Sequence, residues 1–237
     1  MRAIILAGGK GERLRPFTDD RPKPMVEVLG IPIIGYQIQW LQAQGCDHVV
    51  ISCGYRCEVI QGYFGNGEKW GLRIDYSVEE TPLGRGGGIK KAMRMLPDGD
   101  DPLVATNGDI ITNFNIQPLM ASHIQSGDLA TIVLTPFVSP YGIVEIAHEC
   151  RVVGFREKPV LPYWINGGIY VLSREVYGSL PDQGDHEDTT FPQLAREGKL
   201  GAYMTEAFWR AVDTVKDLSE VNRELEKRLI TSFLAQG

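Results

Sequence analysis

Residues 1–28 read MRAIILAGGKGERLRPFTDDRPKPMVEV, and this stretch decides how the rest of the chain is interpreted. The apolar residues 3–7 predict a buried strand, which runs into a loop containing Gly8, Gly9 and Gly11. Glycines directly after a buried strand let backbone N–H groups approach a polyphosphate without a side chain in the way. The stretch therefore opens two possibilities, a phosphate-binding loop or an ordinary strand-to-helix turn.

Two cations after the glycines, Arg13 and Lys23, favour the phosphate site, because both can neutralise phosphate charge. Two better-known glycine loops do not fit. A Walker loop would need Ser or Thr after Lys10, where this chain has Gly11. A dinucleotide-binding loop would need a third glycine where this chain has Leu14.

Composition places the chain among ordinary globular α/β proteins. Its 237 residues suit one large domain, with 43% apolar and 23% charged residues. The net charge of −6 gives no general attraction for nucleic acid, so an anionic ligand needs local cations. No apolar run has the length of a membrane span, and no signal peptide precedes the first strand. We expect a cytoplasmic protein without nucleic-acid or membrane partners, and leave the oligomeric state open, a homo-oligomer included.

The four cysteines give no sign of a metal site. Cys53 and Cys57 are four residues apart, but no second pair or nearby histidine completes a zinc set. For them, as for Cys46 and Cys150, we expect free thiols in a reducing compartment.

Strand-like and helix-like segments alternate along the chain. Expected strands cover residues 48–53, 72–78, 102–110, 129–135, 142–146, 151–159, 166–173, 202–205 and 209–212. Expected helices cover residues 33–44, 58–64, a segment from the glycines at 84–88 to before Pro97, 118–125, one starting near Thr189, and 215–234. This alternation predicts an α/β fold, with a Rossmann-like, mixed but mostly parallel central sheet flanked by helices. We expect residues 135–210 to form a lid-like region over the strand ends.

Three further motifs can carry chemistry. Asp109 ends the NGD sequence at the tip of a buried strand, where such sheets place ligands, and a lone carboxylate there suits Mg²⁺. A turn aspartate is the alternative. The glycines of residues 82–88 could admit a base or ribose, or simply form a flexible turn. Residues 157–159, EKP, could be an inert surface charge pair.

Together the motifs resemble the sugar-1-phosphate nucleotidyltransferases, or nucleoside-diphosphate-sugar pyrophosphorylases. The resemblance rests on their order: LAGGKGERLRPFT (6–18), RPKPM (21–25), ETPLG (80–84), NGD (107–109), FREKP (155–159) and NGGIYVL (166–172). It covers nearly the whole chain. It implies transfer of a nucleotidyl group from an NTP to a sugar-1-phosphate, with release of pyrophosphate and with Mg²⁺ as cofactor. No covalent nucleophile is expected.

The resemblance also implies roles for individual residues. The expected catalytic residues are Arg13, Lys23 and Asp109. Nucleotide contacts are expected from Leu6, Ala7, Gly8, Gly9, Gly11, Pro82, Leu83, Gly84, Gly87, Asn107 and Gly108. Sugar-phosphate contacts are expected from Gly142, Glu157, Lys158, Asn166, Gly167 and Trp209. The expected metal ligands are Asp109 and Asp213. Within a single domain, residues 1–134 would bind the nucleotide and residues 135–212 the sugar phosphate, followed by the helix at 215–234.

The chain departs from the family pattern at two places. Glu12 stands where a small polar residue is usual, and its carboxylate would repel a triphosphate unless it turned outward or paired with a neighbouring arginine. Ala211 stands where most members have the second metal-binding Asp. If this segment is a strand, Asp213 lies on the same face as Ala211 and could reach the metal. The segment from Trp209 onward resembles the glucose-1-phosphate cytidylyltransferase branch.

The substrates stay open at this stage. GTP with a mannose- or heptose-type 1-phosphate is our first expectation, and CTP, UTP or dTTP with glucose-1-phosphate is the alternative. A non-catalytic nucleotide-sugar sensor is the rival from another class, motivated by Ala211. A glycosyltransferase would need a D-x-D motif, which Asp109 does not form. With one helix after the last motif, we expect no C-terminal β-helix domain.

Overall fold

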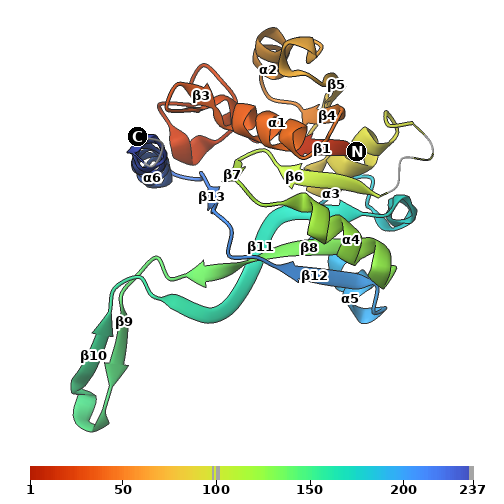
Figure 1. Cartoon of the computed structure of the whole chain (residues 1–237). Helices are drawn as coiled ribbons and strands as arrows, with labels where there is room; N and C mark the ends of the chain where they lie inside the picture. Colours follow the sequence, from red (N-terminus) through yellow and green to blue (C-terminus); the bar gives the residue numbers. More distant parts are fainter. Residues whose placement is uncertain (98, 100–101, 235–237) are drawn as a thin grey trace.

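The structure is a computed structural model that describes residues 1–97, 99 and 102–234. In the described part, a seven-stranded sheet has the order β12-β8-β11-β6-β1-β4-β5 (Figure 1). Its strands are β1 (Arg2–Leu6), β4 (His48–Cys53), β5 (Arg73–Val78), β6 (Leu103–Asn107), β8 (Ala130–Val138), β11 (Val160–Leu172) and β12 (Leu200–Met204). Only β11 runs antiparallel to its neighbours, β6 and β8. The predicted mixed, mostly parallel sheet is confirmed.

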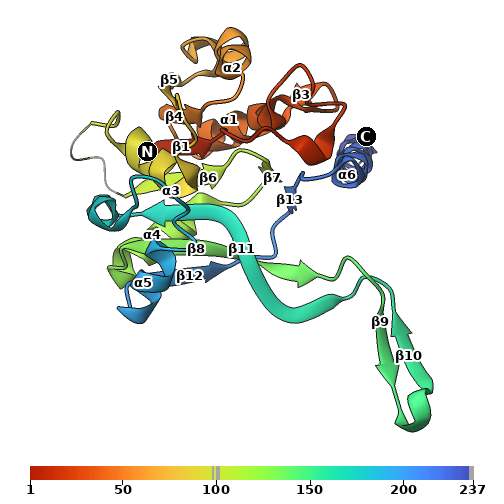
Figure 2. The same ribbon diagram turned by 180° about the vertical axis from the view of Figure 1, so that it is seen from behind.

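Helices cover both faces of this sheet (Figures 1 and 2). The helices are α1 (Ile33–Ala43), α2 (Cys57–Phe64), α3 (Gly84–Met93), α4 (Ile116–Ser126), α5 (Thr190–Arg196) and α6 (Val215–Leu234). Alternate residues of β1 separate the two sides, since Ile5 lies in the core cluster with α1, α2 and α4, and Ile4 in the cluster with α3 and α5. Because both faces are covered, the inner strand β4 is buried at all six positions, including its polar residues His48 and Ser52.

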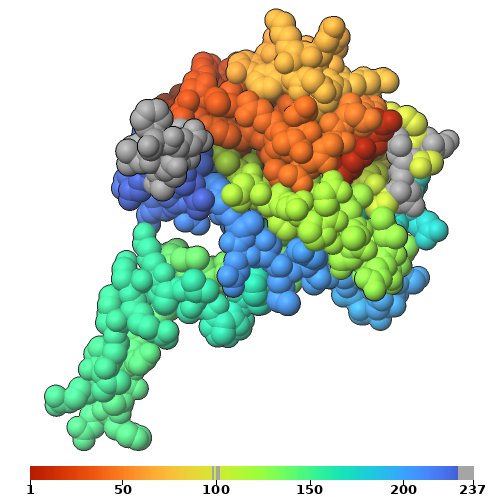
Figure 3. All heavy atoms as spheres, viewed as in Figure 1, coloured from red at the N-terminus to blue at the C-terminus, as the bar shows by residue number. Residues whose placement is uncertain are grey.

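The second half of the chain adds an arm to this body. Strands β9 (Ile143–Ile146) and β10 (Val152–Arg156) form a separate antiparallel pair, which we call the β9–β10 arm. It projects from the end of the long strands β8 and β11 (Figure 3). This region is therefore not a lid alone, because residues 135–212 also supply β11 and β12 to the central sheet.

The last helix docks beside the first motif. Val212, Leu218 and Val221 pack in one buried cluster with Leu14 and Val28. Short elements complete this region: β2 (Glu27–Val28), β3 (Ile31–Pro32), β7 (Ile110–Thr112), β13 (Trp209–Ala211) and the 3-10 turns Glu12–Leu14, Lys23–Met25, Glu68–Trp70, His148–Cys150 and Arg174–Ser179. The packing brings the segment just before α6 next to the loop after β1.

The expectation for the cysteines is wrong at one pair, because Cys53 and Cys57 form a disulfide. Cys53 ends β4 and Cys57 begins α2, and the turn between them brings their Cα atoms to 5.4 Å, the usual separation for a disulfide. Cys46 is a free, buried thiol, and burial raises its pKa to about 11. In the part of the chain that the structure describes, no helix has both the length and the apolar character to cross a membrane.

Candidate active site

The loop after β1 leaves open space where a ligand can approach. A Cβ atom on Gly9 would meet nothing within 4 Å, and one on Gly8 would meet only Glu79, at 3.9 Å. Packing within the fold therefore does not require glycine at these two positions, because a larger side chain would fit there. Gly11 is different, because it has a φ of +72° and a Cβ there would lie 2.7 Å from Cβ of Lys23. Gly11 shapes the turn, whereas Gly8 and Gly9 leave backbone exposed to the cavity.

The cavity lies at the carboxyl ends of β1 and β6, as expected for an open α/β sheet. Its volume is about 330 Å³. It is lined by Leu6, Gly8, Gly9, Lys23, Pro24, Glu79, Pro82, Gly84, Arg85, Asn107, Gly108, Asp109 and Asp185. Most residues expected to bind a nucleotide are thus brought to one place from three separate motifs.

Some expected nucleotide residues lie beside the cavity rather than on its lining. Ala7 is fully buried, and its N–H donates to the Ser52 carbonyl at 2.7 Å. The Leu83 carbonyl accepts a hydrogen bond from Gly184 N–H at 2.7 Å. Gly87 is buried, and a Cβ there would lie 2.6 Å from the Asp182 carbonyl oxygen. Close packing against Asp182 accounts for a glycine at position 87, and the expected contact with the base stays a prediction.

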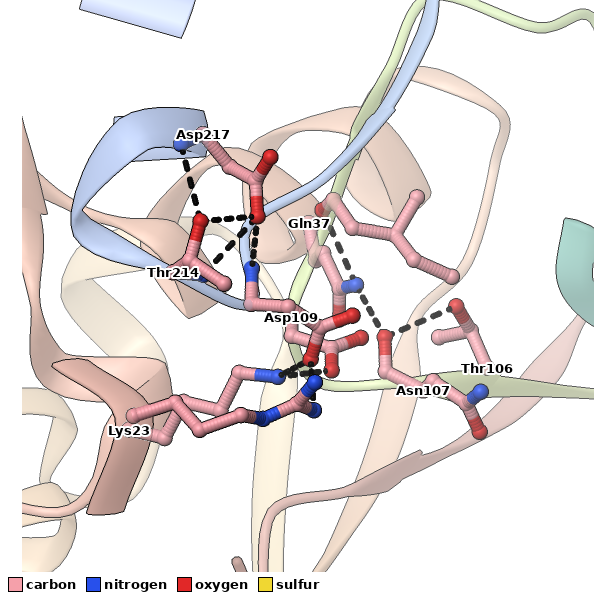
Figure 4. Close-up of polar contacts among 10 residues, drawn as sticks. Lys23, Gln37, Thr106, Asn107, Asp109, Thr214 and Asp217 are labelled. Carbon is pink, nitrogen blue, oxygen red and sulfur yellow. Dashed lines mark hydrogen bonds and ion pairs between the residues drawn. The ribbon is translucent and has the colours of Figure 1, made fainter. Parts of the chain in front are cut away.

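Charged side chains from three separate segments meet at one end of the cavity (Figure 4). Lys23 Nζ lies 2.5 Å from Asp109 Oδ2 and 2.5 Å from Asp213 Oδ1. Arg13 NH2 lies 3.0 Å from the same oxygen of Asp213. Burial lowers the pKa of Lys23, but its hydrogen bonds to the two carboxylates and their charges outweigh this effect and raise the pKa above its usual value.

Asp213 reaches this cluster because β13 pairs with β7 next to Asp109. Val212 N–H donates to the Asp109 carbonyl at 2.9 Å, which fixes the two segments side by side. Asp217, in the first turn of α6, accepts bonds from the backbone N–H groups of Asp213 and Thr214, at 3.2 and 2.8 Å. The strand β13 ends at Ala211, so Asp213 reaches the cluster from the segment that follows the strand, and not from a continued strand as expected.

Asp109 and Asp213 together fit a divalent cation. Both carboxylates already meet around one positive group, the ammonium of Lys23. Mg²⁺ typically takes one or two protein carboxylates and fills its other positions with water and phosphate oxygens. Within the described residues, no group of three or more His, Cys, Asp or Glu side chains has a metal-binding arrangement. A cation here would therefore depend on a bound phosphate for further ligands.

Glu79 is a cavity residue that the sequence did not single out. Its Oε1 accepts from Ser52 Oγ at 2.8 Å and its Oε2 from Leu83 N–H at 3.0 Å. These bonds attach the second glycine segment to the end of β4. A glutamate directly before the ETPLG motif was the available signal, but its partner on β4 could not be known from sequence.

The expected sugar-phosphate residues lie in three places. Gly142 and Glu157 are neighbours near the base of the arm, since a Cβ on Gly142 would lie 2.9 Å from Glu157 Oε2. Lys158 and Trp209 line a separate groove of about 840 Å³ beside α6. There Lys158 Nζ lies 3.4 Å from Glu220 Oε1.

The other two expected sugar residues lie on β11, within the main sheet. The Gly167 carbonyl accepts a bond from Trp209 Nε1 at 2.7 Å, which connects β11 to the groove. Asn166 Nδ2 donates to Tyr170 Oη at 3.0 Å and to Glu187 Oε1 at 2.9 Å. Both amide hydrogens of Asn166 are thus already used within the protein.

Comparison with known proteins identifies the family of the chain. A family model described as nucleotidyl transferase matches residues 2–228. The chain belongs to the nucleotidyl transferase family. A mannose-1-phosphate guanyltransferase of Gibberella zeae is 36% identical over 225 residues, which are 92% of this chain and 62% of that protein. A mannose-1-phosphate guanylyltransferase of Mycobacterium tuberculosis is 34% identical over 244 residues, covering 99% of this chain and 67% of that one.

A solved structure shows the same fold. HddC from Yersinia pseudotuberculosis, in complex with GMP-PN, superposes with a TM-score of 0.74 and 25% identity over 94% of this chain and 99% of that chain. The chain spans 62% of the length of the fungal relative. Its resemblance to family members is therefore established for this part of such proteins.

Glu12 is the residue of the first loop whose orientation the sequence left open. Glu12 is exposed and is not among the residues that line the cavity. The two neighbouring arginines pair with other acids, Arg13 with Asp213 at 3.0 Å and Arg15 with Asp19 at 3.6 Å. Among the described residues Glu12 pairs with neither arginine, and its exposure agrees with an outward orientation in the protein without substrate; its position toward bound phosphates stays a prediction.

Proposed function

We propose that this protein transfers a guanylyl group from GTP to a mannose- or heptose-type 1-phosphate, giving a GDP-sugar and pyrophosphate. The observation that carries the proposal is the meeting of Lys23, Asp109 and Asp213 at the end of a cavity bordered by Gly8 and Gly9. The names of its relatives support the choice of GTP and of a mannose-type sugar. GMP-PN in the HddC structure also supports a guanine nucleotide.

The reaction needs alignment and charge neutralisation more than proton transfer. The attacking phosphate oxygen of the sugar phosphate is already an anion, so no general base is required. Lys23 and Arg13 would screen the repulsion between the two anionic substrates and hold the phosphates in line. Asp109 and Asp213 would hold Mg²⁺, which when bound draws charge from phosphate oxygens. Lys23 would then exchange at least one carboxylate for a phosphate.

The parts of the chain have separate tasks in this proposal. Residues 1–134 would bind the nucleotide, residues 135–212 the sugar phosphate, and the helix at 215–234 would hold Asp213 in place. A cytoplasmic location belongs to the same proposal, because nucleoside triphosphates and sugar phosphates are made there.

The alternative of a non-catalytic sensor rested on Ala211, which replaces a usual metal ligand. Asp213 lies beside Asp109 and offers a carboxylate at the same cluster. Loss of the acid at position 211 therefore no longer argues for a silent protein. CTP, UTP or dTTP with glucose-1-phosphate remains the alternative set of substrates.

The test is pyrophosphate release with Mg²⁺ from a matrix of nucleotides and sugar phosphates. GTP, CTP, UTP, dTTP and ATP are each combined with mannose-, glucose- and heptose-1-phosphate, and omission of the sugar phosphate is the control. We expect the highest kcat/KM with GTP and a mannose- or heptose-type substrate. A maximum with CTP and glucose-1-phosphate would keep the reaction and change the substrates. Absence of release from every pair would contradict the enzymatic function itself.

A further inference from the structure

An ion pair that none of the sequence motifs explains lines the nucleotide cavity. Arg85 and Asp185 both contribute to the lining, from the start of α3 and from the segment before α5. Asp185 Oδ1 accepts from the Arg85 backbone N–H at 2.8 Å, and its Oδ2 accepts from Arg85 NH2 at 3.0 Å. Arg85 NH2 also forms an ion pair with Glu187. The pair thus joins two segments 100 residues apart in sequence.

Both side chains keep hydrogen-bonding capacity for a ligand. The Arg85 guanidinium makes its contacts with Asp185 and Glu187 through Nη2. Among the described residues, its Nε and Nη1 have no hydrogen-bond partner. Each oxygen of Asp185 has one recorded bond and can accept another. The side chains are 44% and 32% exposed, so a molecule in the cavity can reach them. Unused donors therefore lie directly beside unused acceptors.

The segment that carries Asp185 is held rigidly against α3. The Gly184 carbonyl accepts bonds from Gly86 N–H and Gly87 N–H at 2.9 and 3.2 Å. A Cβ on Gly84 would lie 2.7 Å from the carbonyl carbon and oxygen of Gly184, so only glycine allows this approach. The hydrogen bond from Arg85 lowers the pKa of Asp185 and keeps this carboxylate ionised at neutral pH. The pair is therefore ordered and charged before any ligand arrives.

The pair is also connected to a strand expected to bind the sugar. Glu187 Oε1 accepts from Asn166 Nδ2 at 2.9 Å and from Tyr170 Oη at 3.1 Å, while the other oxygen of Glu187 pairs with Arg85. Arg85 is thus one side chain away from β11. The pair lies where the nucleotide cavity meets the sugar-phosphate half of the chain.

The charge of this cluster indicates which ligand group it suits. Arg85 contributes one positive charge, and Asp185 and Glu187 contribute two negative ones, so the cluster does not favour phosphate. A hydroxyl group both donates and accepts, and two neighbouring hydroxyls can pair with a guanidinium and a carboxylate at once. We propose that the Arg85–Asp185 pair is a specificity-determining element that binds a vicinal diol of a substrate. This inference rests on the proposed function.

Two substrates of the proposed reaction carry such a diol, namely the ribose of the nucleotide and the sugar of the 1-phosphate. The test compares kcat/KM for GTP with 2′-deoxy-GTP, 3′-deoxy-GTP and ITP, and for mannose-1-phosphate with its 2-deoxy and 3-deoxy analogues. The variants are Asp185→Asn and Arg85→Gln. The matched control is Asp182→Asn, because Asp182 lies in the same segment, pairs with Lys90 at 2.9 Å and does not line the cavity.

We expect the wild type to prefer the hydroxyl-bearing form of one substrate. Each cavity variant should lose about 10- to 100-fold in kcat/KM for that form, the range for a hydrogen bond to a charged group, and change less than about 3-fold for the deoxy form. The arm in which the preference collapses identifies the diol as ribose or sugar. The Asp182→Asn control should keep the wild-type preference.

Three results would overturn the inference. Equal losses on all substrates would mean that the pair is only structural. An unchanged preference in both variants would mean that it touches no hydroxyl. A changed preference between GTP and ITP, with no change between GTP and its deoxy forms, would mean that it reads the base. Calorimetric binding of GTP and deoxy-GTP measures the preference without turnover. Failure of the proposed function would appear as no pyrophosphate release by the wild type, and can therefore be told apart from failure of this inference.

Discussion

The nucleotide cavity and the groove beside α6 differ in how closely their residues are held together. In the cavity, Lys23, Asp109 and Asp213 meet within hydrogen-bond distance, although they come from three parts of the chain. The residues expected to bind the sugar phosphate are spread over the arm, the groove and β11, and Lys158 is paired with Glu220. The end of the cavity is thus assembled in this structure, whereas the residues expected to bind the sugar phosphate are not gathered into one cavity.

The topology explains this difference. The cavity residues follow neighbouring parallel strands, in which Leu6 pairs with Asn107 and with Ser52, so their carboxyl ends must meet at one edge. Of the residues expected to bind the sugar phosphate, two lie on β11, whose pairing with β8 shifts register between Asn166 and Tyr170, and the others lie near the base of the arm or in the groove beside α6. A register shift of this kind changes where each side chain points. The lesson is that parallel neighbours determine a site more tightly than a long antiparallel extension does.

The largest effect is expected from Asp109→Asn, which tests whether the assembled end of the cavity performs the chemistry. Loss of one carboxylate should weaken metal binding and leave Lys23 with one partner, lowering kcat by about 1,000-fold, as for the loss of one electrostatic contact to a transition state. Asp213→Asn should have a smaller effect of the same kind. The control is Asp188→Asn on an exposed residue. Steady-state pyrophosphate release is the measurement, and near-normal kcat for Asp109→Asn would contradict this role.

A second prediction concerns His186, which is buried and directly follows the cavity residue Asp185 in the chain. Its ring stacks edge-on against Tyr170 and Phe191, and neither ring nitrogen has a hydrogen-bond partner in the described structure. Burial, with help from the charge of Arg85, lowers the pKa of His186 to about 4. The unfolded chain binds this proton near pH 6.5, so the folded state should lose stability as the pH falls from about 6.5 to 4.

The loss attributable to His186 should approach about 3 kcal/mol at the acid end, since one pKa unit corresponds to about 1.4 kcal/mol. The His186→Phe variant should lack this component, and urea unfolding of both proteins between pH 4 and 7.5 measures the difference. His148→Gln, on an exposed histidine of the arm, is the control and should keep the wild-type pH dependence. Parallel pH curves for wild type and His186→Phe would show that the buried ring does not titrate in this way.

Sequence reasoning reached the fold and the cavity better than it reached the contacts between distant segments. The β-branched residues of β4 and the glycines after β1 carry local signals, and the order of the motifs implied one edge for Asp109 and Lys23. The partners of Arg85 and Glu79 carry no such signal, because these contacts join residues far apart in sequence. The disulfide at the end of β4 was also missed, since it depends on the turn geometry rather than on spacing alone.

A third, smaller effect is expected from Lys158, which tests whether the groove takes part in binding the sugar phosphate. The Lys158→Ala variant should raise KM for the sugar phosphate by about 10- to 30-fold, the effect of one lost charged hydrogen bond, and change KM for the nucleotide by less than about 2-fold. The Glu220→Gln variant frees Lys158 from its partner and should leave KM for the sugar phosphate equal or slightly lower. Equal increases of both KM values would place Lys158 at the nucleotide instead.

The smallest effect is expected from Glu12→Thr, which tests whether the Glu12 carboxylate faces the phosphates of a bound nucleotide. A carboxylate facing a triphosphate would repel it, so its removal would lower KM for the nucleotide. Glu12 is exposed and absent from the cavity lining, and the charge of an exposed group is largely screened by solvent. We therefore expect KM for GTP to change by less than about 2-fold, an effect that should also disappear at high salt.

Arg13→Gln is the informative partner variant. Because Arg13 contacts Asp213, its substitution should weaken both GTP binding and turnover. If Glu12→Thr tightened GTP binding by about 10-fold or more, the first loop would have to turn inward around the phosphates, and the outward orientation of Glu12 would describe only the protein without its substrate.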